Sequence, residues 1–135
     1  MKATAWFKDF DKWNKRKKLI DSLKLKENFW FKEREIWWCA LGVNIGYEQD
    51  GKNNNFERPV LILKVFNKEV LFIAPLTTRE KDGKYYYNFK YDNEISSVIL
   101  SQVRLISSKR LLRKIKTLNN NDFIKIKERI LCILK

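Results

Sequence analysis

The 135-residue chain contains no histidine, and this absence restricts its chemistry more than any other feature of its composition. Proton transfer would have to use carboxylate, arginine, lysine, hydroxyl or thiol groups, and a metal site built from histidine is excluded. The only two cysteines, Cys39 and Cys132, lie far apart without a CxxC partner, which predicts reduced and largely buried thiols in a cytoplasmic protein. No apolar run approaches the ~18 residues of a membrane span, and no signal segment opens the chain, so we expect no membrane insertion.

The net charge of +13 is unevenly distributed along the chain. Residues 1–34 carry 11 Lys and Arg against 5 Asp and Glu, and residues 104–135 carry 10 against 2, whereas residues 35–103 carry 8 against 9. Like charges in these basic flanks repel one another when the chain is folded. A polyanionic partner such as nucleic acid is a natural explanation for this charge distribution. The alternative explanation for the basic charge is that the protein comes from a lysine-rich proteome, in which lysine is the default surface residue.

The N-terminal residues predict an amphipathic helix over residues 4–23. Trp6, Phe10 and Trp13 recur at helical spacing, and lysines occupy much of the remaining surface. We expect the three aromatic side chains to be buried against the sheet or a partner subunit. Nucleic-acid contact by the basic face and binding to a membrane surface are the alternatives.

From Glu35 onward the pattern becomes that of a β-sheet in one domain. Short apolar runs separated by turns predict about five strands, over residues 35–41, 59–66, 69–76, 84–91 and 97–106. These strands favour a strongly twisted sheet or a small, partly open barrel. Such a sheet has exposed edges, which homodimerisation commonly covers.

The C-terminal part of the chain predicts helical structure. A short helical segment follows Ser107-Ser108 and extends through Leu112, and a final helix runs from about Asn121 to Leu134. Asn121 or Asp122 is its expected cap. The expected buried stripe consists of Phe123, Ile126, Ile130 and Leu134.

Polar residues gather near the ends of two of the expected strands. The turn Gly46-Tyr47-Glu48-Gln49 precedes Arg58, which opens one strand, and Thr77-Thr78 closes the next. If these two strands pair, the hydroxyl groups lie near the arginine. This combination indicates a small sheet protein that handles a phosphodiester without imidazole.

The order and spacing of five sequence blocks resemble the MazF/PemK family of toxin endoribonucleases. These blocks are Glu35–Trp38, Gly46–Gln49, Arg58–Ile62, Ala74–Thr77 and Ser97–Arg104. The resemblance covers about residues 33–135, so we expect an N-terminal helical extension over residues 1–33 and a family domain over residues 34–135. It implies an α+β, mainly β, SH3-like barrel with a C-terminal helix, and a homodimer that cleaves single-stranded RNA without a metal or cofactor. It also implies a cognate antitoxin that inhibits the toxin and with which it binds DNA.

Carried over by position, the resemblance makes Arg58 the catalytic arginine and Thr77 the catalytic threonine. We nominate Glu48 as the general base for attack of the ribose 2′-hydroxyl on the adjacent phosphorus, which gives a 2′,3′-cyclic phosphate and a 5′-hydroxyl. The planar fork of Arg58 suits stabilisation of the phosphoryl oxygens, and Thr77 could donate to the same phosphate. The expected RNA-binding residues are Tyr47, Gln49, Thr78, Arg79 and Gln102.

Two departures from the family pattern keep other interpretations open. Ile99 and Ser101 stand where the Kid/PemK branch has a catalytic arginine and aspartate, and residues 50–57 look like an insertion. A catalytically inactive, SH3-like nucleic-acid-binding module is therefore one alternative, and a CcdB-like toxin that acts on DNA gyrase is another. Arg58 itself could be an exposed strand-end arginine paired with Glu57 or Glu48.

Overall fold

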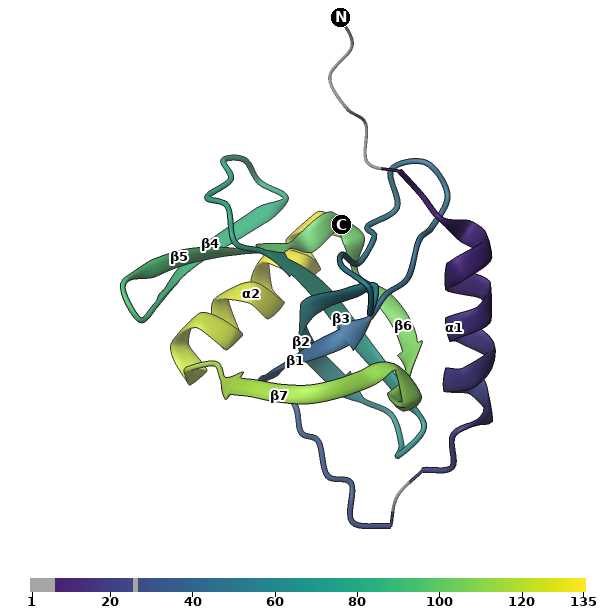
Figure 1. Ribbon diagram of the computed structural model, residues 1–135. Coiled ribbons are helices and arrows are strands. Elements are labelled where there is room, and N and C mark those ends of the chain that lie inside the picture. The colour runs from purple at the N-terminus through teal and green to yellow at the C-terminus, as the bar shows by residue number, and fades with distance from the viewer. Residues whose placement is uncertain (1–6, 26) are drawn as a thin grey trace, which may run out of the picture.

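The computed structural model describes residues 7–25 and 27–135, which form two helices and a seven-stranded antiparallel sheet (Figure 1). The helices are α1 (Phe10–Ser22) and α2 (Asn120–Ile133). The strands are β1 (Glu35–Ala40), β2 (Glu57–Val65), β3 (Val70–Thr77), β4 (Tyr86–Tyr91), β5 (Glu94–Ile99), β6 (Arg104–Ser107) and β7 (Leu111–Thr117). Two 3₁₀ turns, η1 (Leu100–Gln102) and η2 (Ser108–Arg110), flank β6. The fold class expected from the sequence, mainly β with a C-terminal helix, is confirmed.

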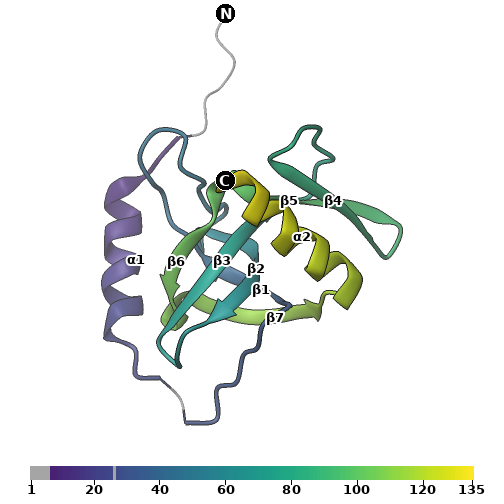
Figure 2. The same ribbon diagram turned by 180° about the vertical axis from the view of Figure 1, so that it is seen from behind.

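The strands follow the order β4-β5-β3-β2-β1-β7, and β6 pairs with the part of β3 that β5 leaves free. The sheet is strongly twisted but not closed into a barrel, and it has seven strands rather than about five. Seen from both sides, α2 crosses one face of the sheet, while α1 runs along the opposite side of the molecule next to β6 (Figures 1 and 2). The sheet therefore lies between the two helices.

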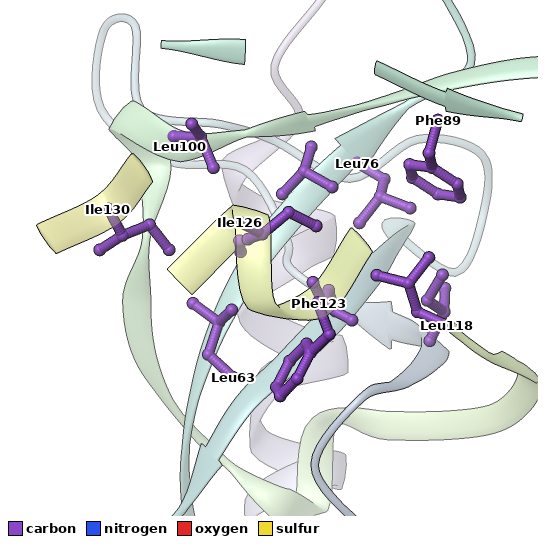
Figure 3. Close-up of a cluster of buried hydrophobic side chains, with 12 residues drawn as sticks. Leu63, Leu76, Phe89, Leu100, Leu118, Phe123, Ile126 and Ile130 are labelled. Atoms are coloured by element: carbon purple, nitrogen blue, oxygen red, sulfur yellow. The ribbon is translucent and has the colours of Figure 1, made fainter. Parts of the chain in front are cut away.

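Both faces of the central strands are buried, which explains why β1, β2 and β3 are apolar along nearly their whole length. One face packs against α2, where Phe123 and Ile126 belong to one buried cluster with Leu63 and Leu76 (Figure 3). The other face holds a second cluster formed by Trp37, Cys39, Leu41, Val60, Ile62, Leu71, Ile73, Ile106 and Leu111. Each fully buried aliphatic side chain of this kind contributes about 1.5–3 kcal/mol.

Helix α1 is shorter than the sequence pattern predicts. It begins at Phe10, because the Asp9 side chain caps it by accepting from the Lys12 N–H at 3.0 Å. Trp13 is buried as expected, but Phe10 is 49% exposed, so its expected burial is wrong. Trp6 and the rest of residues 4–6 lie outside the described residues.

The expected fifth strand, residues 97–106, is wrong as a single element. The chain leaves the sheet after β5, makes the turn η1 and returns as β6, because Leu100 turns into the core beneath α2. The short helix expected after Ser108 is only the 3₁₀ turn η2, and β7 follows it.

The C-terminal helix is confirmed, with differences at both ends. Asn119 caps α2, rather than Asn121 or Asp122, since its side chain accepts from the Asp122 N–H at 2.8 Å. Leu134 follows the helix and is 74% exposed, so its expected burial is wrong. Cys39 is buried but Cys132 is exposed, against the expectation for the second thiol. Neither helix in the described part of the chain is long and apolar enough for a membrane crossing.

Candidate functional site

Arg58 lies near the start of β2 and is only 8% exposed. Its Nε donates to the Asp50 carbonyl at 2.7 Å, and its Nη1 donates to the Leu76 carbonyl at 3.0 Å. The Gln49 amide lies against the same guanidinium, and with its oxygen turned inward it accepts from Nε at 3.2 Å and Nη2 at 2.9 Å. Of the five guanidinium N–H groups, one on each terminal nitrogen is left over from these contacts among the described residues.

Burial lowers the pKa of Arg58, and the nearby charge of Asp50 partly offsets this effect. The alternative of an exposed arginine paired with Glu57 is wrong. Glu57 instead accepts from Arg113, with N–O distances of 3.0 and 3.4 Å. Arg58 is therefore a buried cation bound by backbone carbonyls and an amide, and its position is fixed by the fold.

Thr77, the last residue of β3, shares the face of the sheet on which Arg58 lies. Val60 pairs with Pro75, and continuing this antiparallel register by two residues places Arg58 opposite Thr77. Side chains alternate along strands, so both residues belong to the face that carries Val60 and Ile62. The Leu76 carbonyl that accepts from Arg58 belongs to the peptide immediately before Thr77. The Thr77 Oγ1 accepts from the Arg79 N–H at 3.4 Å.

The loop between β1 and β2 brings Glu48 and Gln49 to this region. Gln102, in the turn η1, holds the loop from the other side. Its Oε1 accepts from the Gln49 N–H at 3.1 Å, and its Nε2 donates to the Tyr47 carbonyl at 3.0 Å. The Tyr47 side chain is 100% exposed and free to stack on a base, whereas both ends of the Gln102 amide contact the loop backbone.

A polar cavity of about 280 Å³ lies between this loop and η1. Glu48, Gln49 and Gln102 line it, together with Asn44, Ser101, Val103 and Arg104. The Glu48 carboxylate is exposed, and its Oε1 accepts from the Ile45 N–H at 3.0 Å. The cavity thus collects a carboxylate, three carboxamides and a cation, and one of the carboxamides, Gln49, lies against the Arg58 guanidinium.

Arg104 is a candidate that sequence reasoning missed. The sequence pattern places it within the expected strand of residues 97–106, yet its side chain lines the cavity and is half-buried. Burial lowers the pKa of Arg110, and repulsion from Arg104 lowers it further. The same two arginines lie close enough to Cys39 to oppose the effect of burial, which raises the pKa of that thiol to about 12. Arg104 and Arg110 therefore place two positive charges near Cys39. The only sequence signal for Arg104 was its position at the end of the Ser97–Arg104 block.

Three of the expected RNA-binding residues, Tyr47, Thr78 and Arg79, do not line the cavity, and neither do the expected catalytic residues Arg58 and Thr77. Thr78 is one residue beyond Thr77 and so points to the opposite face of the sheet, where it lines a separate apolar pocket of about 160 Å³ with Pro59 and Trp38. Arg79 is exposed in the following loop and contacts Thr77 only through its backbone. Ile99, at the position of the Kid-type arginine, is buried, while Ser101, at the position of the aspartate, lines the cavity.

Two further observations concern other possible binding sites: a second cavity and clusters of metal ligands. A larger cavity of about 480 Å³ lies between the approach to β4 and the end of α2, lined by Tyr85 and Arg129 among others, and contains none of the expected site residues. No group of three or more potential metal ligands of the Cys, Asp, Glu or His type occurs among residues 7–25 and 27–135.

Comparison with known proteins places this arrangement in a family. Among solved structures, the chain is similar to MazF (Form-I) from Deinococcus radiodurans, with a TM-score of 0.66, 16% identity, and coverage of 79% of this chain and 98% of that one. It is also similar to the Mycobacterium tuberculosis toxin MazF-mt6, with a TM-score of 0.58, 21% identity, and coverage of 75% and 96%. An endoribonuclease in complex with its cognate antitoxin from a mycobacterial species gives a TM-score of 0.58, 13% identity, and coverage of 78% and 95%.

The structural likenesses are below 25% identity and show the fold alone. A search of curated proteins gave no match. The family assignment comes from a sequence model described as a PemK-like, MazF-like toxin of type II toxin–antitoxin system, which matches residues 32–134, more than half of the chain. With the fold and the family in agreement, the chain belongs to the PemK-like, MazF-like toxins of type II toxin–antitoxin systems.

Proposed function

We propose that the protein is an endoribonuclease toxin that cleaves single-stranded RNA without a metal ion, acts as a homodimer and is inhibited by a cognate antitoxin. One observation carries the proposal: a buried arginine is held beside the peptide that precedes Thr77, next to a polar cavity. The family assignment supports the toxin and endoribonuclease class, and the solved complex of a similar fold supports an antitoxin partner.

The proposed reaction uses the ribose of the RNA as its nucleophile. The 2′-oxygen loses its proton and forms a bond to the adjacent phosphorus, and the bond from phosphorus to the 5′-oxygen breaks. The departing 5′-oxygen gains a proton, so the products are a 2′,3′-cyclic phosphate and a 5′-hydroxyl. Glu48 is our candidate for the base, since its carboxylate is exposed at the cavity.

Arg58 would stabilise charge on the phosphoryl oxygens with its two remaining N–H groups. Because backbone carbonyls already fix the guanidinium, little reorganisation is needed when charge develops on the phosphate. Thr77 would donate its hydroxyl to the same phosphate, and Arg104 would add a positive charge at the neighbouring cavity.

Arg58→Ala tests the proposal on a long RNA of mixed sequence incubated with excess EDTA. We expect the wild-type protein to cleave at a preferred short motif and to leave cyclic-phosphate ends. Cleavage should fall by ~100- to 1,000-fold in the variant, the usual cost of removing one preorganised donor to a developing oxyanion. Lys125→Ala, which removes one positive charge from the exposed face of α2, is the matched control and should cleave normally.

An RNA with a 2′-deoxyribose at the scissile nucleotide separates this mechanism from hydrolysis by water. It should resist cleavage entirely, since its nucleophile is missing. Full activity of Arg58→Ala would remove the proposed centre. Salt-sensitive RNA binding without any cyclic-phosphate product would instead identify an inactive binding module.

A further inference from the structure

Lys8, two residues before α1, reaches into the loop of residues 44–50. Its Nζ donates to the Asn44 carbonyl at 2.6 Å and to the Gly46 carbonyl at 2.8 Å, and it lies 3.4 Å from Asp50 Oδ2. An ammonium group has three donors, and all three acceptors here belong to this one loop. The N-terminal extension thus clamps the segment that carries Glu48 and Gln49.

Burial of apolar side chains contributes little to holding this loop in place. Ile45 is 79% exposed and Tyr47 fully exposed, so the loop buries little apolar surface of its own. Its internal hydrogen bonds are local, as in the Asn44 N–H donating to Asp50 Oδ1 at 2.6 Å. The bonds from outside the loop come from Gln102 on one side, from Lys8 on the other, and from Arg58, whose Nε donates to the Asp50 carbonyl. Segments with few buried contacts open readily, so the order of this loop depends on these bonds.

The clamp is coupled to the catalytic arginine through Asp50. The Asp50 carbonyl accepts from Arg58 Nε, while the Asp50 carboxylate, whose side chain is 11% exposed, is the group that Lys8 contacts. Without Lys8, this buried carboxylate would be costly, and its charge would act on Arg58 without a balancing cation. The positive charge of Lys8 therefore offsets Asp50 and leaves the charge of Arg58 available to a phosphate.

Lys8 is itself held in position by the docking of α1. Five residues further along, Trp13 is 5% exposed and packs against Phe56 with a centroid distance of 5.4 Å. Lys12 Nζ also donates to Asn54 Oδ1 at 3.2 Å. Figure 1 shows the N-terminal end of α1 beside the loop that joins β1 to β2. The helix and the loop thus form one packed unit.

We propose that Lys8 is a positioning residue for RNA cleavage, and that the N-terminal extension is consequently part of the catalytic site. The proposal rests on the nuclease function proposed above. Lys8 contacts no substrate in this mechanism. It acts by holding residues 44–50 in register with Arg58. The family match begins at residue 32, so Lys8 lies outside the region that defines the family, whereas the loop that it holds lies inside it.

Lys8→Met tests the proposal, because methionine keeps the length of the side chain and removes the ammonium. Lys8→Arg restores the charge and the donors, and Lys15→Met removes the same charge from an exposed position of α1. We expect Lys8→Met to lower kcat by ~10- to 100-fold with KM within about twofold, since small misplacements of catalytic groups have effects of this size. Lys8→Arg should recover most of the activity, and Lys15→Met should match the wild type.

Amide hydrogen exchange supplies a readout that does not require activity. In Lys8→Met the amides of residues 44–51 should exchange at least about tenfold faster, while those of the buried strand residues 60–63 stay unchanged. Equal kcat for Lys8→Met and Lys15→Met would overturn the proposal. Lost activity without faster exchange in the loop would also overturn it, as would a change confined to KM and its salt dependence, which would mean direct RNA contact. If the wild type cleaves no RNA, the proposed function fails, and the exchange experiment still decides whether Lys8 holds the loop.

Discussion

Replacing Gly42 by alanine probes how closely α1 is docked against the loop after β1. Gly42 has a φ of +80°, and a Cβ at this position would lie 2.0, 2.3 and 2.5 Å from three atoms of the Trp13 indole. No real Cβ makes such contacts, so either the indole or the backbone must move. Gly46 provides the matched control, because its φ is +58° and a Cβ added there would meet nothing within 4 Å.

The two substitutions share one cost and differ in another. An alanine held in the left-handed region costs ~1–2 kcal/mol at either position. At Gly42 the displacement of Trp13 adds to this, and full loss of a buried tryptophan costs ~3–5 kcal/mol. Since the indole can shift without leaving its site entirely, we expect Gly42→Ala to destabilise the protein by about 2–3 kcal/mol more than Gly46→Ala.

Urea unfolding followed by far-ultraviolet circular dichroism measures this difference. The decisive comparison repeats Gly42→Ala in a Trp13→Ala background, where the clash is gone. There the substitution should cost no more than Gly46→Ala does in the wild type, which gives a coupling free energy of about 2–3 kcal/mol between neighbouring residues. Equal costs for Gly42→Ala and Gly46→Ala in the wild type would refute the described packing of α1.

Three further predictions concern titrating groups. Burial raises the pKa of Glu35, but hydrogen bonds from Lys114, the Lys32 N–H and Trp37 together bring it below its ordinary 4.5, so Glu35→Gln should destabilise the protein at neutral pH. This loss should vanish in denaturation curves as pH falls through the folded-state pKa. In the native protein a thiol reagent should modify only Cys132, because Cys39 is fully buried; two rapid modifications would contradict this. Burial and the Asp122 hydrogen bond raise the pKa of Tyr87 to about 12, so Tyr87→Phe should remove the latest phenol ionisation from an ultraviolet titration.

Strand β7 was missed because local sequence patterns do not indicate a strand there. β7 reads Leu-Leu-Arg-Lys-Ile-Lys-Thr, which has neither the alternation nor the apolar content of the other strands. Its charges are matched only by residues distant in sequence. Arg113 binds Glu57 and lies over the Trp38 ring at 5.0 Å, and Lys114 Nζ is 2.9 Å from Glu35 Oε2. These partner residues lie next to β7 only when β1 and β2 have formed.

The candidate site was predictable to the extent that strand register determines it. The antiparallel pairing of β2 with β3 follows from the short turn between them, and it places Arg58 and Thr77 on one face. The burial of Arg58 was not predictable, because it depends on contacts with the loop between β1 and β2. The use of Gln102 as a support for that loop was not predictable either, because it depends on the turn η1 replacing the expected straight strand. Arg104 was overlooked for the same reason.

The packing of α1 limits how its sequence and that of the loop between β1 and β2 can change independently in evolution. Lys8, Lys12 and Trp13 all contact residues between 42 and 56, so the helix and the long loop constrain each other during divergence. Grafting this loop onto a compact homologue would transfer its sequence without the ammonium that braces it. A chimera should therefore exchange both segments together, and natural recombination faces the same requirement.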